Sequence, residues 1–256
     1  MSVDAPSLIG RGLTTQQRAQ VAAAYDRLPP EERASVLSAL YAEVETRSAR
    51  DGLFWLTFVN TRDEADPQRT IKAFPLHLDY VRDTWTLLEA QQRIVIAKSR
   101  QMFVSWILSA FAVWTARYKP NSLVIYQTQK WEDAVAMVAT PGSAKDGGYA
   151  GRMQFIEAHL PSWMRARFIS SEGQIDYPNG SRVMALAGGA NQIRGKTATL
   201  VIEDEFAFQP GAKGVYTAVA PLIQKGAKFI AVSTPNGAEG SLFYHLWSGI
   251  PYDVAV

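Results

Sequence analysis

Three acidic residues stand together where an apolar segment of the sequence ends, in the stretch LVIEDEF at residues 200–206. Asp204 and Glu205 follow each other at the end of an expected strand, where successive side chains point in different directions. One carboxylate could therefore hold Mg²⁺ while the other orients or deprotonates a water molecule. A cation nearby would also relieve the repulsion that Glu203 adds to this cluster. A solvated turn after a buried strand is the alternative explanation of the same residues.

A second polar stretch, KSRQMFVS, occupies residues 98–105 between an expected strand and an expected helix. The usual phosphate-binding loop has the pattern G-x-x-x-x-G-K-S/T in that position. When the two are aligned on Ser105, Lys98 and Phe103 stand at the glycine positions and a valine stands at the lysine position. Lys98 and Arg100 could still reach β- and γ-phosphates from the other side of the loop, and the first N–H groups of the helix could bind an anion. Taken alone, the segment favours a plain strand leading into a helix over a phosphate-binding loop.

Two further polar stretches lie on either side of the acidic segment. In KFIAVSTPNG, the hydroxyl residues Ser233 and Thr234 end an expected strand and could sense a γ-phosphate, although a Pro-Asn-Gly turn explains the same letters. In GGANQIRGKT, the basic residues Arg194 and Lys196 lie in a glycine-flanked loop just before the acidic strand. A solvated basic loop is the alternative there.

The elements that must position these residues follow from the spacing of the apolar side chains. Apolar strands separated by helices predict a mostly parallel sheet with helices on both faces. Ligands bind such sheets at the carboxyl ends of the strands, where the polar stretches at 98–105, 204–205 and 233–237 all fall. An Asn-Gly pair within residues 177–180 predicts a hairpin. The expected helices cover residues 78–90, 104–117 and a segment from 131, and the expected strands cover 93–97, 122–127, 199–203, 228–232 and short segments on both sides of 177–180.

The N-terminal part of the chain predicts helices over residues 14–49. A first helix, capped by Thr14 or Thr15, runs through Ala24, and a second begins at the prolines and acids of residues 29–32. Residues 61–67 predict a loop. The second helix has one apolar face at spacings of three and four residues, formed by Leu37, Leu40, Tyr41 and Val44.

Composition limits the class of protein. The chain has 256 residues, of which 47% are hydrophobic, so it can bury a sizeable core. The absence of cysteine excludes disulfides and thiolate metal sites, and the three histidines are too far apart in sequence to predict a metal site. A net charge of +2 means that any contact with DNA must be local. The first ten residues lack the features of a signal peptide, and the longest apolar stretch is about half a membrane span, so no membrane partner is expected.

Together, these stretches resemble the ATPase domain of the large terminase subunit, the motor that packages DNA into the procapsids of tailed phages. The resemblance covers residues 76–245 and depends on KSRQM with Ser105 as an unusual Walker A motif. It also depends on LVIEDE as Walker B, on STPNG as the coupling motif, and on YPNGSRVMALAGGANQIRG before Walker B. In that family the Walker A lysine is often displaced towards the start of the loop, where Lys98 stands. Glycine is usual where Phe103 stands, so this position departs from the family pattern.

The resemblance implies an α/β fold, namely a P-loop (ASCE-type) NTPase with a mostly parallel central sheet between helices, plus an N-terminal helical subdomain. We therefore expect a helical subdomain over residues 1–75 and a P-loop ATPase core over residues 76–256. The family's second half is a nuclease domain. We expect it to be absent from this chain, because the sequence ends at Val256 soon after the coupling motif.

The resemblance also implies ATP hydrolysis with Mg²⁺, coupled to translocation of double-stranded DNA into a procapsid. It assigns a role to individual residues. The catalytic residues would be Glu205 and Arg194, the latter acting on a neighbouring subunit. The metal-binding residues would be Asp204 and Ser105, and the coupling or sensor residues would be Ser233 and Thr234. The residues that bind ATP would be Lys98, Ser99, Arg100, Gln101, Ser105 and Tyr80.

The partners implied are double-stranded DNA, a portal protein and a small terminase subunit. The active form would be a homo-oligomeric ring, with a monomer as a form in solution, and a phage-encoded protein of this kind would work in the host cytoplasm. Two other functions fit the same residues. One is a helicase-type or other P-loop ATPase that remodels nucleic acid, and the other is a non-hydrolysing assembly or DNA-binding module that keeps the P-loop fold.

Overall fold

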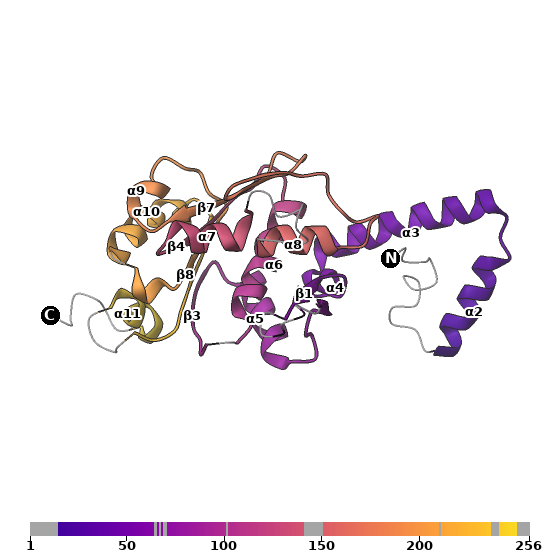
Figure 1. Ribbon diagram of the computed structural model, residues 1–256, viewed down its shortest axis with the longest axis horizontal. Coiled ribbons are helices and arrows are strands. Elements are labelled where there is room, and N and C mark those ends of the chain that lie inside the picture. The colour runs from indigo at the N-terminus through magenta and orange to yellow at the C-terminus, as the bar shows by residue number, and fades with distance from the viewer. Residues whose placement is uncertain are drawn as a thin grey trace.

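Seven strands form one sheet in the order β3-β9-β8-β4-β7-β6-β5, with helices packed on it (Figure 1). The computed structural model describes residues 15–63, 66, 68, 71–100, 102–140, 151–209, 211–236 and 241–249. The strands of this sheet, in spatial order, are β3 (Arg93–Ala97), β9 (Lys228–Ser233), β8 (Leu200–Asp204), β4 (Leu123–Thr128), β7 (Arg182–Ala187), β6 (Gln174–Asp176) and β5 (Ile169–Ser171).

The strands β3, β9, β8, β4 and β7 run parallel to one another. β6 pairs with β7, and β5 with β6, in antiparallel fashion. This confirms the predicted mostly parallel sheet and the hairpin at residues 177–180. The fully buried strand β8 reads as one apolar run up to its acids, as is typical of a parallel sheet covered on both faces. β9 lies between β3 and β8, so one strand separates the loop after β3 from the acids of β8, which is the ASCE arrangement.

Helices cover both faces of the sheet, as expected. Alternate residues of β4 show this: Val124 and Tyr126 belong to one hydrophobic cluster with α5, α6, α7 and α8, whereas Ile125 belongs to a second cluster with α10 and α11. The helices that follow the N-terminal region are α5 (Asp79–Ala90), α6 (Val104–Tyr118), α7 (Trp131–Val138), α8 (Arg152–His159), α9 (Ala190–Ile193), α10 (Ala212–Gln224) and α11 (Leu242–Ser248), with a 3₁₀ turn η1 (Phe206–Phe208) after β8.

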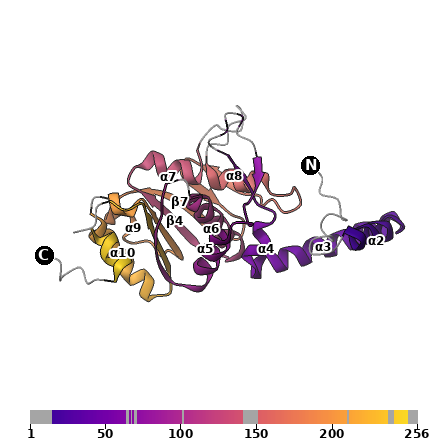
Figure 2. The same ribbon diagram turned by 90° about the horizontal axis from the view of Figure 1, so that it is seen from below.

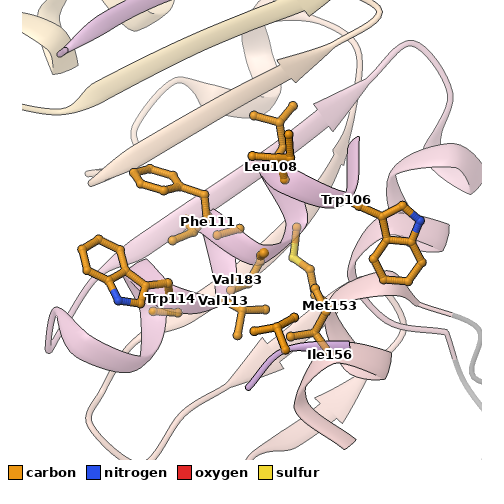
Figure 3. Packing of buried hydrophobic residues seen from close by; sticks show 14 of the residues in the cluster. Trp106, Leu108, Phe111, Val113, Trp114, Met153, Ile156 and Val183 are labelled. Atoms are coloured by element: carbon orange, nitrogen blue, oxygen red, sulfur yellow. The ribbon is translucent and has the colours of Figure 1, made fainter. Parts of the chain in front are cut away.

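Helix α6 is buried on almost all sides. Figure 3 shows its residues Val113 and Trp106 in a cluster with Met153 and Ile156 of α8 and Val183 of β7. A helix that is apolar all round can only be stable inside a core, so α6 is fixed in position by packing. Ser105, in the first turn of this helix, is held in place by the same packing.

The N-terminal helices α2 (Thr15–Asp26) and α3 (Pro30–Arg50) extend away from the sheet in both views (Figure 2). α3 starts at the predicted proline and acid signal, and α2 starts at Thr15, within the predicted start. Of the predicted apolar face of α3, Val44 is buried, Leu40 and Tyr41 pack partly on the core, and Leu37 is half-exposed. Tyr41 stacks on Trp163 with ring centroids 4.4 Å apart. Only the last part of α3 is therefore attached to the body.

Residues 52–74 pack into the same core as the sheet. They form α4 (Gly52–Leu56) and an antiparallel hairpin of β1 (Asn60–Arg62) and β2 (Ile71–Ala73), which was not predicted. Trp55 is fully buried and its ring lies 6.3 Å from that of Trp85 on α5. The predicted division of the chain at residue 75 remains a prediction.

A buried ion pair joins α3, α6 and α8 on the side of the core away from the acids of β8. Arg117 donates to Glu157 at 2.9 Å, and the Glu157 side chain is fully buried. Tyr118 donates its phenol hydrogen to Glu45 of α3 at 2.7 Å. These contacts attach the end of α3 to the core. Among the residues that the structure describes, no helix is long and apolar enough to cross a membrane.

Candidate active site

The carboxyl ends of β3, β8 and β9 meet at one edge of the sheet and bring the three predicted polar stretches together. Ala97 is in register with Ser233, and Asp204 is in register with Val232. The Lys98 N–H continues this pairing by donating to the Ser233 carbonyl at 3.0 Å. The sequence predicted that these stretches would fall at strand ends, and the structure confirms it.

Asp204 is the centre of this edge. The Lys98 ammonium lies 3.3 Å from Asp204 Oδ1 and 3.1 Å from Ser105 Oγ, and the Ser105 hydroxyl donates to Asp204 Oδ2 at 3.1 Å. The Lys98 and Asp204 side chains are only 14% and 6% exposed, so water screens this pair much less than a surface pair. Lys98, which does not stand at the usual lysine position of the motif, thus contacts both the Ser105 hydroxyl and the Asp204 carboxylate.

These positions fit a divalent cation bound with a nucleotide. The positively charged Lys98 ammonium already lies between the Asp204 Oδ1 and Ser105 Oγ atoms. Hard cations such as Mg²⁺ prefer oxygen ligands of this kind. Among the described residues, no group of three or more histidine or acidic side chains could hold a metal alone. Mg²⁺ is usually held by one or two carboxylates together with phosphates and water.

Tyr126 of β4 also contacts Asp204, and this contact was not predicted from the sequence. Its phenol donates to Asp204 Oδ2 at 2.7 Å, and its side chain is fully buried. Burial, and next the neighbouring Asp204 carboxylate, raise the pKa of Tyr126 well above its usual range, so the phenol keeps its proton. Tyr126 lies in register with Ile202 on the adjacent strand β8, and only the strand order reveals that they are neighbours.

Glu203, Asp204 and Glu205 occupy three different environments. Glu205 is exposed at the strand end and has a left-handed backbone conformation with φ of 56°, whereas Asp204 is buried. Glu203 is fully buried, and its carboxyl oxygen accepts from the Gln209 amide at 3.0 Å. Burial raises the pKa of Glu203 well above its usual range, which favours the neutral acid. The repulsion expected among three acids is therefore reduced because Glu203 favours its neutral form, and Glu205 remains the acid that water can reach.

Phe103 takes the backbone conformation for which glycine is normally used. Its φ is 60° and its ψ is 0°, at the residue just before α6. For a residue with a side chain, this left-handed conformation costs about 1–2 kcal/mol. The Phe103 ring packs edge-on against Phe74 at 5.3 Å and stacks on Trp106 at 6.1 Å. Two such ring pairs contribute roughly 1–3 kcal/mol, which offsets the backbone cost. The loop therefore bends at this position without glycine.

The other predicted residues lie around this cluster. Ser99 and Arg100 are exposed in the loop, and Gln101 lies outside the described residues. Ser233 is buried, and its hydroxyl accepts from the Ala207 N–H at 3.2 Å, which joins the end of β9 to the 3₁₀ turn after Glu205. Thr234 is half-buried, as is Tyr80, which packs on the core from α5. The roles predicted for these residues remain predictions.

Arg194 is exposed at the end of α9 and stays away from the Asp204 cluster. Its guanidinium donates to Asn191 at 3.2 Å, and in the described part of the chain no hydrogen bond or ion pair joins it to Asp204 or Glu205.

Gln127, which the sequence analysis did not single out, anchors the start of the loop that contains Arg194. Its fully buried amide donates to the carbonyls of Ala187 and Gly189, the latter at 3.3 Å. The loop is thus held at its base, and its arginine faces outwards.

Comparison with known families adds an independent finding. Residues 95–250 match the family described as terminase large subunit, T4likevirus-type, N-terminal. The chain belongs to the large terminase subunit family. The match begins within β3 and continues through α11, so it contains the whole Lys98–Ser105–Asp204 cluster and the Arg194 loop.

Solved structures of large terminases are also similar to this chain. The ATPase domain of the large terminase from Thermus phage P74-26 is 17% identical with a TM-score of 0.44, and the match covers 60% of this chain and 64% of that one. The large terminase of bacteriophage HK97 is 13% identical with a TM-score of 0.49, over 70% of this chain and 38% of that one. A large terminase from a thermophilic bacteriophage in complex with ADP is 12% identical with a TM-score of 0.48, over 68% of this chain and 42% of that one. This terminase chain therefore spans less than two thirds of the length of these proteins.

Replacement of Phe103 tests the bend of the loop. Both Phe103→Ala and Phe103→Gly lose the ring contacts, but only Ala retains the cost of a left-handed backbone. We expect both variants to be less stable than the natural protein, and Phe103→Gly to be more stable than Phe103→Ala by about 1 kcal/mol. Denaturant unfolding measures this difference. In the exposed helix position Ala39, the control Ala39→Gly should show the opposite order, with Gly less stable by about 1 kcal/mol. Equal stability of the two Phe103 variants would contradict the strained loop.

Proposed function

We propose that this large terminase chain is an ATP-hydrolysing motor domain that drives double-stranded DNA into a phage procapsid. The observation that carries the proposal is the Lys98–Ser105–Asp204 cluster at the carboxyl edge of a P-loop sheet, in a chain of this family. These are the three chemical groups that a P-loop ATPase needs around phosphates and Mg²⁺: an ammonium, a hydroxyl and a carboxylate.

In this proposal, Lys98 moves from Asp204 to the β- and γ-phosphates when ATP binds. Its departure leaves Asp204 and Ser105 with oxygen atoms directed at the cation that accompanies ATP. Mg²⁺, when bound there, would supply neutralisation of the negative charge on the phosphates. The N–H groups in the first turn of α6, which follow the bend at Phe103, would bind phosphate oxygens. Ser99 and Arg100 belong to the same loop and would also contact the nucleotide, a role we propose for Gln101 as well, and Tyr80 would lie on the adenine side.

Glu205 would act as the base for hydrolysis. A water oxygen forms a bond to the γ-phosphorus while the bond between that phosphorus and the β–γ bridging oxygen breaks. The water proton passes to the Glu205 carboxylate, and ADP leaves with the electron pair of the broken bond. Glu205 is the exposed acid next to Asp204, so it can reach a water molecule on the phosphate side. Ser233 and Thr234 would report the state of the γ-phosphate to the turn after Glu205, to which Ser233 is bonded.

The two alternatives are weaker than the motor assignment. A non-hydrolysing module was suggested by the phenylalanine at a glycine position, but Phe103 adopts the left-handed conformation that glycine would. A helicase-type ATPase is less consistent with a family match over residues 95–250. The partners we propose are therefore those of a packaging motor, namely double-stranded DNA, a portal protein and a small terminase subunit, with a ring of copies as the active form. Such a motor would act in the host cytoplasm.

The base role of Glu205 can be tested with Glu205→Gln. The amide keeps the shape of the side chain but cannot take a proton, so we expect turnover to fall by at least about 10²-fold while ATP still binds. Phosphate release and ATP affinity should be measured together on the same preparation. Glu172→Gln, which removes an exposed acid from the turn between β5 and β6, is the matched control and should change neither quantity. Turnover near that of the natural protein would exclude Glu205 as the base.

We also propose that Arg194 acts on the site of the adjacent subunit. Arg194 is exposed and donates to Asn191, and among the described residues no hydrogen bond or ion pair joins it to Asp204. Both observations support this role, because a group that serves a neighbour must face outwards. An arginine that stabilises the transferred phosphoryl group is worth about 10³–10⁵ in rate. Arg194→Ala and Glu205→Gln should each be inactive alone. In mixed rings, a Glu205→Gln subunit supplies Arg194 to a neighbour with an intact Glu205, so ATPase activity should partly recover.

The mixing experiment requires rings that contain both variants, which two different affinity tags can select. Asn191→Ala removes the side chain to which Arg194 donates and leaves the arginine present, so it serves as a control that should retain activity. No recovery in rings that contain both variants would exclude action on the neighbour. Full activity of Arg194→Ala by itself would exclude any catalytic role.

A further inference from the structure

We propose that Tyr126 is a positioning residue for Asp204, holding that carboxylate in the orientation required to bind Mg²⁺ with the nucleotide. This inference rests on the proposed ATPase function and deepens it. The observation behind it is the 2.7 Å hydrogen bond from the Tyr126 phenol to Asp204 Oδ2, made from the interior of the sheet. No other phenol among the described residues contacts an acid at this edge of the sheet.

The Asp204 carboxylate accepts four hydrogen bonds from the described residues, two at each oxygen. Oδ1 accepts from Lys98 Nζ at 3.3 Å and from the Glu205 N–H at 3.0 Å. Oδ2 accepts from the Ser105 hydroxyl at 3.1 Å and from Tyr126 at 2.7 Å. The bond from Tyr126 is the shortest of the four. A carboxylate held at both oxygens cannot rotate about its own axis.

The four donors differ in how easily they can leave. Lys98 has a flexible side chain in the loop, and Ser105 lies in the first turn of α6, so both face the space where phosphates would bind. Tyr126 lies in β4 between β8 and β7, its side chain is fully buried, and its ring is part of the main hydrophobic cluster. When Lys98 moves to the phosphates and the Ser105 hydroxyl turns to the cation, the bonds from Tyr126 and from the Glu205 N–H remain, one at each oxygen.

The remaining lone pair of each Asp204 oxygen is then fixed in direction. A metal ligand that is already oriented by a neighbouring hydrogen bond binds the metal more tightly, and loss of such a neighbour typically costs 10–100-fold in metal affinity. The phenol ordinarily titrates near pH 10, so it remains a donor at neutral pH. Tyr126 would therefore set how much Mg²⁺ is needed to bind ATP, without touching ATP itself.

The variant Tyr126→Phe keeps the ring in the core and removes only the donor. The half-saturating Mg²⁺ concentration should be measured from the affinity of a fluorescent ATP analogue at increasing Mg²⁺, and again in EDTA. We expect the half-saturating concentration to rise by about 10–100-fold, while the affinity in EDTA stays within about twofold, because the phenol contacts no phosphate group in this proposal. Thermal melting without nucleotide shows how well the variant folds.

Tyr118→Phe is a matched control. Tyr118 donates its phenol hydrogen to the Glu45 carboxylate at the same 2.7 Å, but at the α3–α6 junction. Its loss should lower the melting temperature without moving the half-saturating Mg²⁺ concentration. A second control combines Tyr126→Phe with Asp204→Asn. Because Tyr126 acts through the Asp204 carboxylate, Tyr126→Phe should cause no further change in Mg²⁺ dependence when Asp204 is already an amide.

Site-specific incorporation of 4-aminophenylalanine at position 126 restores a donor of similar size and should return the Mg²⁺ dependence to within a few-fold of the natural protein. It also serves as the deciding variant if Tyr126→Phe does not fold, since a folded amino variant with strongly altered Mg²⁺ dependence would overturn the inference. An unchanged half-saturating Mg²⁺ concentration in folded Tyr126→Phe would overturn it too, and would leave the proposed function intact. If the natural protein binds no nucleotide at any Mg²⁺ concentration, the proposed function fails and the inference fails with it.

Discussion

A single buried carboxylate, that of Asp204, constrains the arrangement of the whole carboxyl edge of the sheet. An ionised group this little exposed would cost several kcal/mol if it were left without partners. Three of its partners come from separate segments: Lys98 from the loop after β3, Ser105 from α6 and Tyr126 from β4. The fourth is the N–H of the next residue, Glu205. They can meet only because β4 is adjacent to β8 and because the loop after β3 crosses the end of β9.

The same constraint accounts for the strained loop before α6. Ser105 must lie within reach of Asp204, and α6 is fixed on almost all sides by the core, so the chain has to turn sharply between Lys98 and the helix. The left-handed conformation at Phe103 makes that turn. Packing of its ring on Phe74, just after the β1–β2 hairpin, ties the loop to the N-terminal part of the chain. Local strain at the site is thus balanced by contacts outside it.

Much of the fold could be predicted from the sequence, because buried parallel strands read as continuous apolar runs. The limits of β3 agree with the prediction, and those of β8 and β9 differ by one residue. The β1–β2 hairpin was missed, since its strands are only three residues long and β1, Asn60–Arg62, contains no apolar residue. The contact of Tyr126 with Asp204 could not be predicted either, because it depends on which strands are neighbours, and a single sequence does not contain the strand order. Nor was the burial of Glu203 predicted.

The central claim is that Lys98 exchanges Asp204 for the phosphates of ATP while the contacts of Asp204 with Tyr126 and the Glu205 N–H persist. The most direct test is an experimental structure of this large terminase domain with Mg²⁺ and a non-hydrolysable ATP analogue. We expect the Lys98 ammonium to have left its position 3.3 Å from Asp204 Oδ1 and to contact a β- or γ-phosphate oxygen. The bond from Tyr126 to Asp204 should remain. Phosphates bound away from residues 98–105, or an unchanged Lys98–Asp204 pair beside bound nucleotide, would contradict the account.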